Sequence, residues 1–115
     1  MTWAVLPSIQ VQSWLVALDE ETIATVLDCI SELTRQGPQL GRPLVGKLSG
    51  SMIANLKELR PITNQQGHIR IIFAFDPKRQ AVLLLAGDKR GQWEKWYKKH
   101  IPIAERMFLD HLTTL

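Results

Sequence analysis

Three short apolar runs in the second half of the chain most constrain its fold, because each has strand-like composition and brief polar segments join them. Residues 53–60 end at Pro61, residues 69–75 end at Asp76-Pro77, and residues 80–86 follow at once. A polar stretch at 63–67 supplies the first turn. Connections this short place consecutive strands side by side in antiparallel order. The runs therefore predict a three-stranded antiparallel meander.

The first half predicts a short strand followed by two helices. Residues 2–6 form a strand that Pro7 ends. Apolar residues then recur at helical spacing after Ser8, a suitable N-cap, and again after Asp19, which caps a second helix. Gly37-Pro38 stops that helix, and residues 37–51 are expected to be a connecting loop.

The end of the chain is expected to be helical. Trp93, Trp96 and Tyr97 lie at helical spacing, Pro102 interrupts the pattern, and a final helix begins near Ile103. The predicted fold is one α+β domain over residues 1–115. An N-terminal αα-hairpin and a C-terminal helix pack on a four-stranded, mainly antiparallel sheet.

Positive charge gathers on the predicted meander. Residues 57–115 hold eleven Lys and Arg against six Asp and Glu, whereas residues 1–56 carry a net charge of −2. The period of two in strand 69–75 places Ile71 and Phe73 on the face toward the helices and Arg70 on the other face, out of the core. A basic second half suits a polyanionic partner.

Composition excludes several classes of protein. One cysteine, Cys29, permits no internal disulfide and is expected to be an inert helix residue, and no apolar run is long enough to span a membrane. The start of the chain lacks the pattern of a secretory signal, so a cytoplasmic protein is expected. His68, His100 and His111 have no nearby cysteine or carboxylate at metal-ligand spacing, so no metal site is predicted.

The order of several segments resembles a known family. These segments are Lys57-Glu58-Leu59-Arg60, residues 70–77 (RIIFAFDP), Gly87-Asp88-Lys89, Trp96-Tyr97-Lys98-Lys99 and Ile101-Pro102-Ile103-Ala104. Together they resemble the phage-derived HigB-like branch of the RelE/ParE toxin superfamily, over almost the whole chain. The resemblance implies a RelE-like fold and a type II toxin.

In that family the toxin is a metal-independent endoribonuclease that needs no cofactor. The resemblance implies cleavage of mRNA on the ribosome, inhibition of translation, and neutralisation by a helix-turn-helix, HigA-like antitoxin. Operator DNA would be contacted only through the antitoxin. No membrane partner is implied.

The resemblance also implies site residues. Lys57 would lie near the scissile phosphate, Arg70 would bind and polarise it, and Lys89 or Arg90 would be the basic residue after the last strand. Tyr97 would stack on a base or assist proton transfer. The implied RNA-binding residues are Arg60, Arg90, Trp96 and Lys98.

Other interpretations remain open at this point. Glu58 and Arg60 can form an ordinary exposed ion pair, and Trp93 is expected to pack in the core. A catalytic Lys57 needs a lowered pKa, which clustering with Arg60 and Arg70 would provide. Alternative functions are a ParE-like, non-catalytic inhibitor of DNA gyrase and a basic nucleic-acid-binding module without toxic activity.

Overall fold

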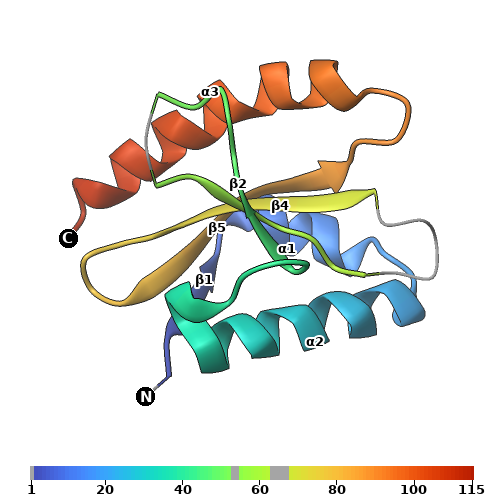
Figure 1. The fold of residues 1–115 in the computed structure, drawn as a ribbon, viewed down its shortest axis with the longest axis horizontal. Helices are drawn as coiled ribbons and strands as arrows, with labels where there is room; N and C mark the ends of the chain where they lie inside the picture. Colours follow the sequence, from blue (N-terminus) through green and yellow to red (C-terminus); the bar gives the residue numbers. More distant parts are fainter. Residues whose placement is uncertain (1, 53–54, 63–67) are drawn as a thin grey trace.

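The fold places one sheet between two layers of helix (Figure 1). The computed structural model describes residues 2–52, 55–62 and 68–115. Three helices, one 3₁₀ turn and five strands follow one another along the described chain: β1 (Ala4–Pro7), α1 (Ile9–Val16), α2 (Glu20–Gln36), η1 (Gly37–Gln39), β2 (Val45–Lys47), β3 (Lys57–Leu59), β4 (Ile69–Phe75), β5 (Gln80–Asp88) and α3 (Trp93–Leu112).

The sheet has the strand order β1-β5-β4-β3-β2. Strands β3, β4 and β5 pair antiparallel, which confirms the predicted meander, and β1 pairs parallel with β5. The α+β class and the mainly antiparallel sheet are thus confirmed. Of the predicted strand 53–60, the structure forms Lys57–Leu59 as β3, while residues 53–54 and the predicted turn at 63–67 lie outside the described residues.

The prediction of four strands is wrong, because β2 adds a fifth at the edge beside β3. Strand β2 lies within the segment that was expected to be a loop, and it pairs antiparallel with β3. It has three residues with glycine in the middle, which is too short for an alternating pattern to emerge. Gly46 lies under the Arg60 guanidinium, and a Cβ at this position would collide with it. Pairing with β3 therefore defines this strand.

Local signals set the ends of the first two helices as predicted. Ser8 Oγ accepts a hydrogen bond from the Val11 amide at 3.1 Å, and Asp19 Oδ1 accepts one from the Thr22 amide at 2.8 Å. Helix α2 ends at Gly37, whose φ of 57° is a left-handed conformation that glycine adopts without strain. These local features set where the two helices begin and where the second one ends.

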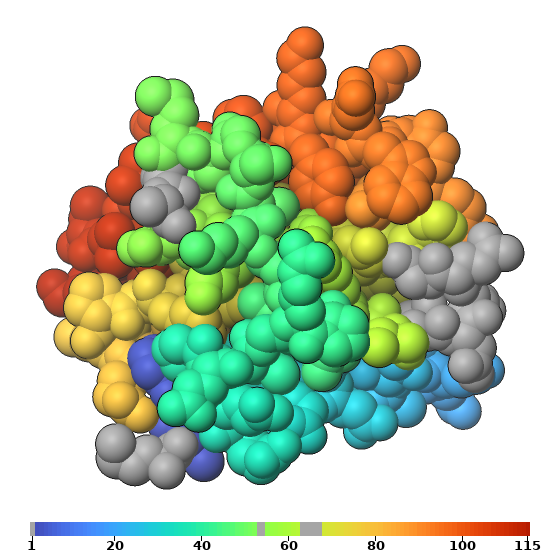
Figure 2. Space-filling view, in the orientation of Figure 1, coloured from blue at the N-terminus to red at the C-terminus, as the bar shows by residue number. Residues whose placement is uncertain are grey.

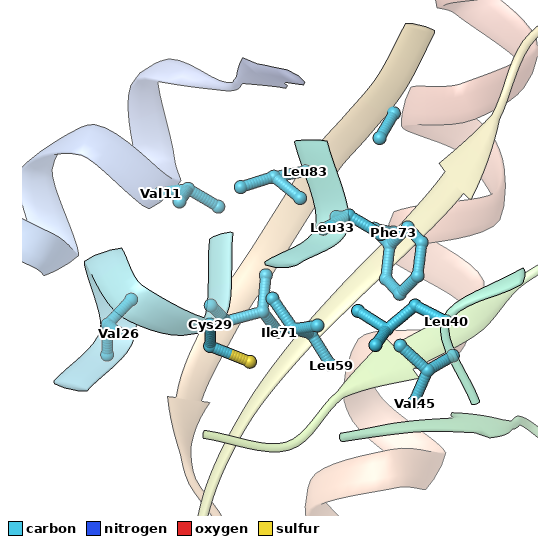
Figure 3. Packing of buried hydrophobic residues seen from close by; sticks show 11 residues of the cluster. Val11, Val26, Cys29, Leu33, Leu40, Val45, Leu59, Ile71, Phe73 and Leu83 are labelled. Carbon is cyan, nitrogen blue, oxygen red and sulfur yellow. The ribbon is translucent and has the colours of Figure 1, made fainter. Parts of the chain in front are cut away.

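The first core fills the space between α1, α2 and the sheet (Figure 3). Ile71 and Phe73 of β4 point into it, which confirms the predicted inner face of this strand. Cys29 is buried there, and burial followed by the charge of Glu32 raises its thiol pKa to about 12. The thiol is therefore an inert part of the packing.

The second core lies on the other face of the sheet, under α3. Ile72 and Ala74 of β4 are fully buried there against Trp96 and Phe108. The prediction that the Arg70 face looks out of the core is therefore wrong, since α3 covers this face. A helix that docks from the far end of the sequence cannot be inferred from the period of one strand.

Helix α3 is continuous across Pro102, so the predicted break is wrong. Proline removes one helical hydrogen bond and crowds the carbonyl four residues earlier. Here Pro102 is exposed, while Ile101 and Ala104 beside it are buried against the sheet. Packing on both sides of the proline outweighs the lost bond. No helix among the described residues is both long and apolar enough to cross a lipid bilayer.

A bulge in β5 changes which face its last residues occupy. The register against β4 shifts between Ile72 and Phe73, and Leu84 and Leu85 both pack on the α3 side. Beyond the bulge, Gly87 lies opposite Arg70 and directly under Trp96, whose Nε1 would be 2.9 Å from a Cβ at that position. The bulge thus directs the end of β5 toward α3.

Candidate active site

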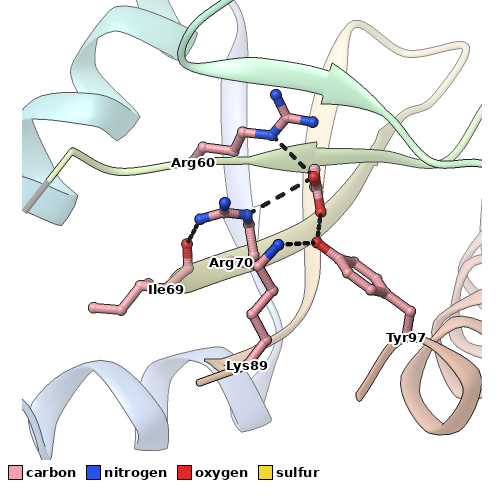
Figure 4. A network of polar contacts seen from close by, with 6 residues as sticks. Arg60, Ile69, Arg70, Lys89 and Tyr97 are labelled. Carbon is pink, nitrogen blue, oxygen red and sulfur yellow. Dashed lines mark hydrogen bonds and ion pairs between the residues drawn. The ribbon is translucent and has the colours of Figure 1, made fainter. Parts of the chain in front are cut away.

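A polar cluster interrupts the second core near the start of α3 (Figure 4). Glu58 comes from β3, Arg70 from β4, Lys89 from just after β5, and Tyr97 from α3. The sheet register brings them together. Glu58 pairs with Ile72, so it shares the face of the sheet that α3 covers, and Arg70 pairs with Gly87 at the end of β5. Residues far apart in sequence therefore share one small site.

Glu58 is the centre of the cluster, with 4% of its surface exposed. The Tyr97 hydroxyl donates to its Oε2 at 2.7 Å, and Arg60 Nε donates to its Oε1 at 2.9 Å. Arg70 Nε lies 3.8 Å from the same Oε1 in an ion pair. One carboxylate is therefore shared between two guanidinium groups and a phenol.

Arg70 is held close to the sheet. Its side chain is 12% exposed, and Nη1 donates to the Ile69 carbonyl at 2.8 Å. The guanidinium is thus fixed in place beside Glu58, and such pre-oriented donors are suited to binding phosphate oxygens.

Lys89 is also 4% exposed. Its Nζ donates to the Tyr97 hydroxyl at 3.1 Å and lies 3.7 Å above the centre of the Trp93 ring. Burial, followed by the charges of Arg70 and Arg60, lowers the lysine pKa below its ordinary value, and Glu58 opposes this only in part. A lysine of this kind gives up its proton more readily than a surface lysine.

Tyr97 joins the two charged groups of this network. Burial, the hydrogen bond to Glu58 and the Glu58 charge together raise the pKa of its phenol to about 12. The phenol therefore keeps its proton near neutral pH and acts as a donor toward Glu58. The chain of contacts from Lys89 through Tyr97 to Glu58 is a continuous hydrogen-bonded path.

The charges in this cluster do not balance. Arg60, Arg70 and Lys89 face the single carboxylate of Glu58, which leaves two positive charges in excess. A pocket of about 370 Å³ opens beside them, lined by Lys47, Leu48, Ser49, Glu58, Arg60, Glu94 and Tyr97. The lining itself holds two cations and two carboxylates, so the positive excess comes from the buried Arg70 and Lys89, and it favours a negatively charged ligand.

Lys57 does not join the cluster. Its neighbour Glu58 faces α3, so the alternation of the strand turns Lys57 to the opposite face, where its Nζ lies 5.5 Å from the centre of the Phe75 ring. The expected clustering of Lys57 with Arg60 and Arg70 is therefore wrong. The sequence left the register between these strands undetermined, and the register decides which cations meet.

The other predicted residues differ in how exposed their side chains are. Arg90 is exposed near Asp88, with 3.8 Å between their charged atoms, and Lys98 is exposed beside a pocket next to Tyr97. Trp96, predicted to bind RNA, is 5% exposed and packs over Gly87. Trp93, predicted for the core, is 52% exposed above Lys89. The two tryptophans thus exchange their expected places.

Glu58 is the functional candidate that sequence reasoning did not place in the site. The pairing with Arg60 is confirmed, but the pair was expected to be exposed and the carboxylate is buried. One signal was available, since residues 58 and 60 share a face of a predicted strand. Their burial depends on α3, which begins more than thirty residues later. Among the described residues, no group of three His, Cys, Asp or Glu side chains is placed to hold a metal ion.

Comparison with known proteins identifies the family. Residues 13–109 match the family model described as phage-derived protein Gp49-like. The chain is 50% identical over 97 residues to HigB3 of Mycobacterium tuberculosis, a proposed toxin, covering 84% of this chain and 82% of that protein. The protein belongs to the Gp49-like HigB family. It is a homologue of HigB-like toxins.

A second relative of the HigB family is longer than this chain. HigB2 of M. tuberculosis, also a proposed toxin, is 47% identical over 103 residues, which are 90% of this chain. The chain spans 51% of the length of HigB2.

Solved structures show that this HigB-like chain has the RelE fold. A double mutant of Escherichia coli RelE in the free state has a TM-score of 0.60, with 11% identity, 80% of this chain and 88% of that chain covered. A chain of the Pyrococcus horikoshii RelE-RelB complex gives 0.59, with 24% identity and coverage of 80% and 99%. The M. tuberculosis RelBE2 toxin-antitoxin complex gives 0.57, with 17% identity and coverage of 76% and 99%.

Proposed function

We propose that this protein is the toxin of a type II toxin-antitoxin system and that it cleaves mRNA without a metal ion. The observation that carries the proposal is the buried network of Glu58, Tyr97 and Lys89 between Arg60 and Arg70. It contains one proton acceptor, one readily deprotonated donor and fixed cations. RNA cleavage by the 2′-hydroxyl requires these three functions.

Each residue has a role in the proposed reaction. Glu58 accepts the proton of the 2′-hydroxyl while the 2′-oxygen attacks the adjacent phosphorus. Arg70 stabilises the negative charge that develops on the phosphate oxygens, and Arg60 holds the Glu58 carboxylate and adds positive charge. The bond from phosphorus to the 5′-oxygen breaks, and Lys89 gives its proton to that oxygen. The products are a 2′,3′-cyclic phosphate and a free 5′-hydroxyl.

Tyr97 is a positioning residue in this scheme, because its hydroxyl contacts both Glu58 and Lys89. Trp93 takes the RNA-binding role first expected of Trp96 and stacks on a base, since its ring is exposed beside the site. An unpaired base on such a ring gains about 1 to 3 kcal/mol. The exposed cations Arg90 and Lys98 bind the flanking backbone. Lys57 has no catalytic role here.

We further propose that cleavage takes place on the ribosome and that a helix-turn-helix antitoxin neutralises the protein. The M. tuberculosis RelBE2 and P. horikoshii RelE-RelB structures are toxin-antitoxin complexes of the same fold. Their existence supports a protein partner of this kind for the present chain.

The test is brief induction of the wild-type protein in bacteria, followed by mapping of new 5′ ends in cellular mRNA. New ends that depend on Arg70 and appear in translated regions are expected. The matched control is Lys78→Ala, which removes one exposed cation in the turn between β4 and β5. Intact messages together with blocked DNA supercoiling would contradict the proposal and favour a gyrase inhibitor.

A further inference from the structure

A second basic pocket lies across the sheet from Glu58. It has a volume of about 370 Å³, within the range of small ligand sites, and it borders the edge strand β2. Its lining is Pro38, Gln39, Leu40, Gly41, Arg42, Val45, Gly46, Lys47 and Lys57. Figure 2 shows the segment that supplies most of these residues across the middle of the face, between α2 below and α3 above.

The cations of this pocket are not neutralised by protein. Lys47 and Lys57 lie directly opposite each other across β2 and β3, an arrangement in which like charges repel and destabilise the pair of strands. Arg42 adds a third cation, and the lining contains no carboxylate. Across residues 2–52, 55–62 and 68–115, no acidic group lies within ion-pair distance of these three cations.

The two basic pockets share one residue. Lys47 lines both this pocket and the pocket beside Glu58 and Arg60 on the other face. Strand β2 is the edge of the sheet, so a chain passing around that edge moves from one pocket to the other at Lys47. Regularly spaced negative charges on a flexible strand match this path.

We propose that Arg42, Lys47 and Lys57 form a second phosphate subsite, which holds a backbone phosphate of the RNA strand whose scissile phosphate lies at Arg70. This inference rests on the proposed function, because it assigns both pockets to one RNA. Lys57 is a positioning residue in this arrangement. It anchors the strand from the face opposite the chemistry, where its Nζ lies 5.5 Å from the centre of the Phe75 ring.

The experiment measures binding of uncleavable, fully 2′-O-methylated RNA to the purified full chain across a series of salt concentrations. Two lengths are compared: a dinucleotide, whose single bridging phosphate cannot fill two phosphate subsites at once, and an RNA of roughly nine nucleotides. The variant is Lys57→Gln, which keeps the first two methylene groups of the side chain and removes the charge. The control is Lys78→Gln, an equal charge change at a residue that lines neither pocket.

We expect Lys57→Gln to weaken binding of the longer RNA on the order of fivefold and to reduce its salt slope by about 0.7. Binding of the short RNA and both affinities of the Lys78 variant should stay at wild-type values. An equal loss for both lengths, or no loss for either, would overturn the subsite. The subsite would also be overturned if Lys57→Gln weakened binding of an acidic poly-glutamate peptide but not of RNA. The pocket would then bind an acidic protein segment.

Failure of the proposed function is read separately. A wild-type protein that never cleaves unmodified RNA contradicts catalysis, whereas the length-dependent loss on methylated RNA needs no cleavage. Conversely, the wild type could cleave RNA while Lys57→Gln binds the longer RNA as tightly as the wild type. That result would support the proposed function and contradict the subsite.

Discussion

Two carboxylates are buried against α3 in this protein, Glu58 near its start and Asp76 near its end, and their surroundings differ. Asp76 accepts from the Lys78 and Gln80 amides at 2.9 and 3.0 Å, from the Gln80 side chain at 2.6 Å, and contacts His111 Nε2 at 2.7 Å. Its partners complete a tight turn and attach it to the helix.

Glu58 instead lies among cations whose charge it cannot balance. Folding gains little from such an arrangement, because taking several charges out of water costs free energy that one ion pair rarely returns. The comparison indicates that Asp76 serves stability and that the Glu58 cluster serves an anionic ligand. The experiments below test that division.

The largest effect is expected from loss of Arg70 or Glu58. Replacing either with alanine should reduce RNA cleavage by a factor on the order of 100 to 1,000, because a transition-state cation or the proton acceptor is removed. Initial cleavage rates with purified protein and ribosomes, beside a circular-dichroism check of folding, measure this. Wild-type rates in both folded variants would refute the assigned roles.

Loss of Asp76 should act on stability. Asp76→Ala leaves the turn amides and His111 without their acceptor, and we expect about 2 kcal/mol of destabilisation in urea unfolding at neutral pH. The exposed Asp110→Ala is the matched control. Below its unfolding temperature the variant should cleave RNA at the wild-type rate per folded molecule. A loss of cleavage without a loss of stability would contradict a purely structural role for Asp76.

The acid side of the stability profile should depend on Asp76. Burial raises the pKa of its carboxyl, but the hydrogen bonds from His111, Gln80 and Lys78 outweigh this and lower it overall. The stabilisation is therefore present above the ordinary pKa of about 4 and is lost as pH falls through the lower folded value. Asp76→Asn should flatten the decline in stability below about pH 4, and an unchanged decline would contradict this cause.

A smaller effect tests the Glu58 side through Tyr97, the only tyrosine in the chain. Its ultraviolet phenolate absorbance should titrate with a pKa of about 12 in the folded protein, against about 10 when unfolded. The phenol contributes fully to the free energy of unfolding below about pH 10, and this contribution is lost as pH rises toward about 12. Glu58→Gln should lower the midpoint by about one unit, and an unchanged midpoint would show that Glu58 does not influence the phenol.

The smallest effect is expected at the surface of α3. Arg106 and Asp110 are 81% and 72% exposed and lie 3.7 Å apart, so Arg106→Ala should change the unfolding free energy by less than about 0.5 kcal/mol. Urea unfolding at low and high salt checks this. If Arg106→Ala lowered the unfolding free energy as much as Asp76→Ala, the exposed ion pair with Asp110 would matter as much as the buried Asp76, and the contrast would be wrong.

The predictions that succeeded rest on short-range physics. A capping side chain such as Ser8 or Asp19 contacts an amide three residues away, and short turns force neighbouring strands to pair. The resemblance to HigB-like toxins was likewise present in the order of local segments, and the family is confirmed. Arg70, Lys89 and Tyr97, which the resemblance implies as site residues, lie together in the structure.

The failures all involve contacts between distant segments. The three-residue β2 exists because β3 pairs with it, and Pro102 is tolerated because its neighbours are buried. Strand alternation separates Lys57 from Glu58, but the register between strands and the docking of α3 decide which of the two faces holds the buried cluster.

The sequence by itself determined the ends of the first two helices, the meander and the family, since these depend on neighbouring residues or on the order of motifs. Only the tertiary structure decided which charged side chains meet. The strand register, the β5 bulge and the docking of α3 set that outcome, and each brings together residues separated by long stretches of chain. The physical reason is that burial, which turns an ion pair into a site, is a property of the packed fold.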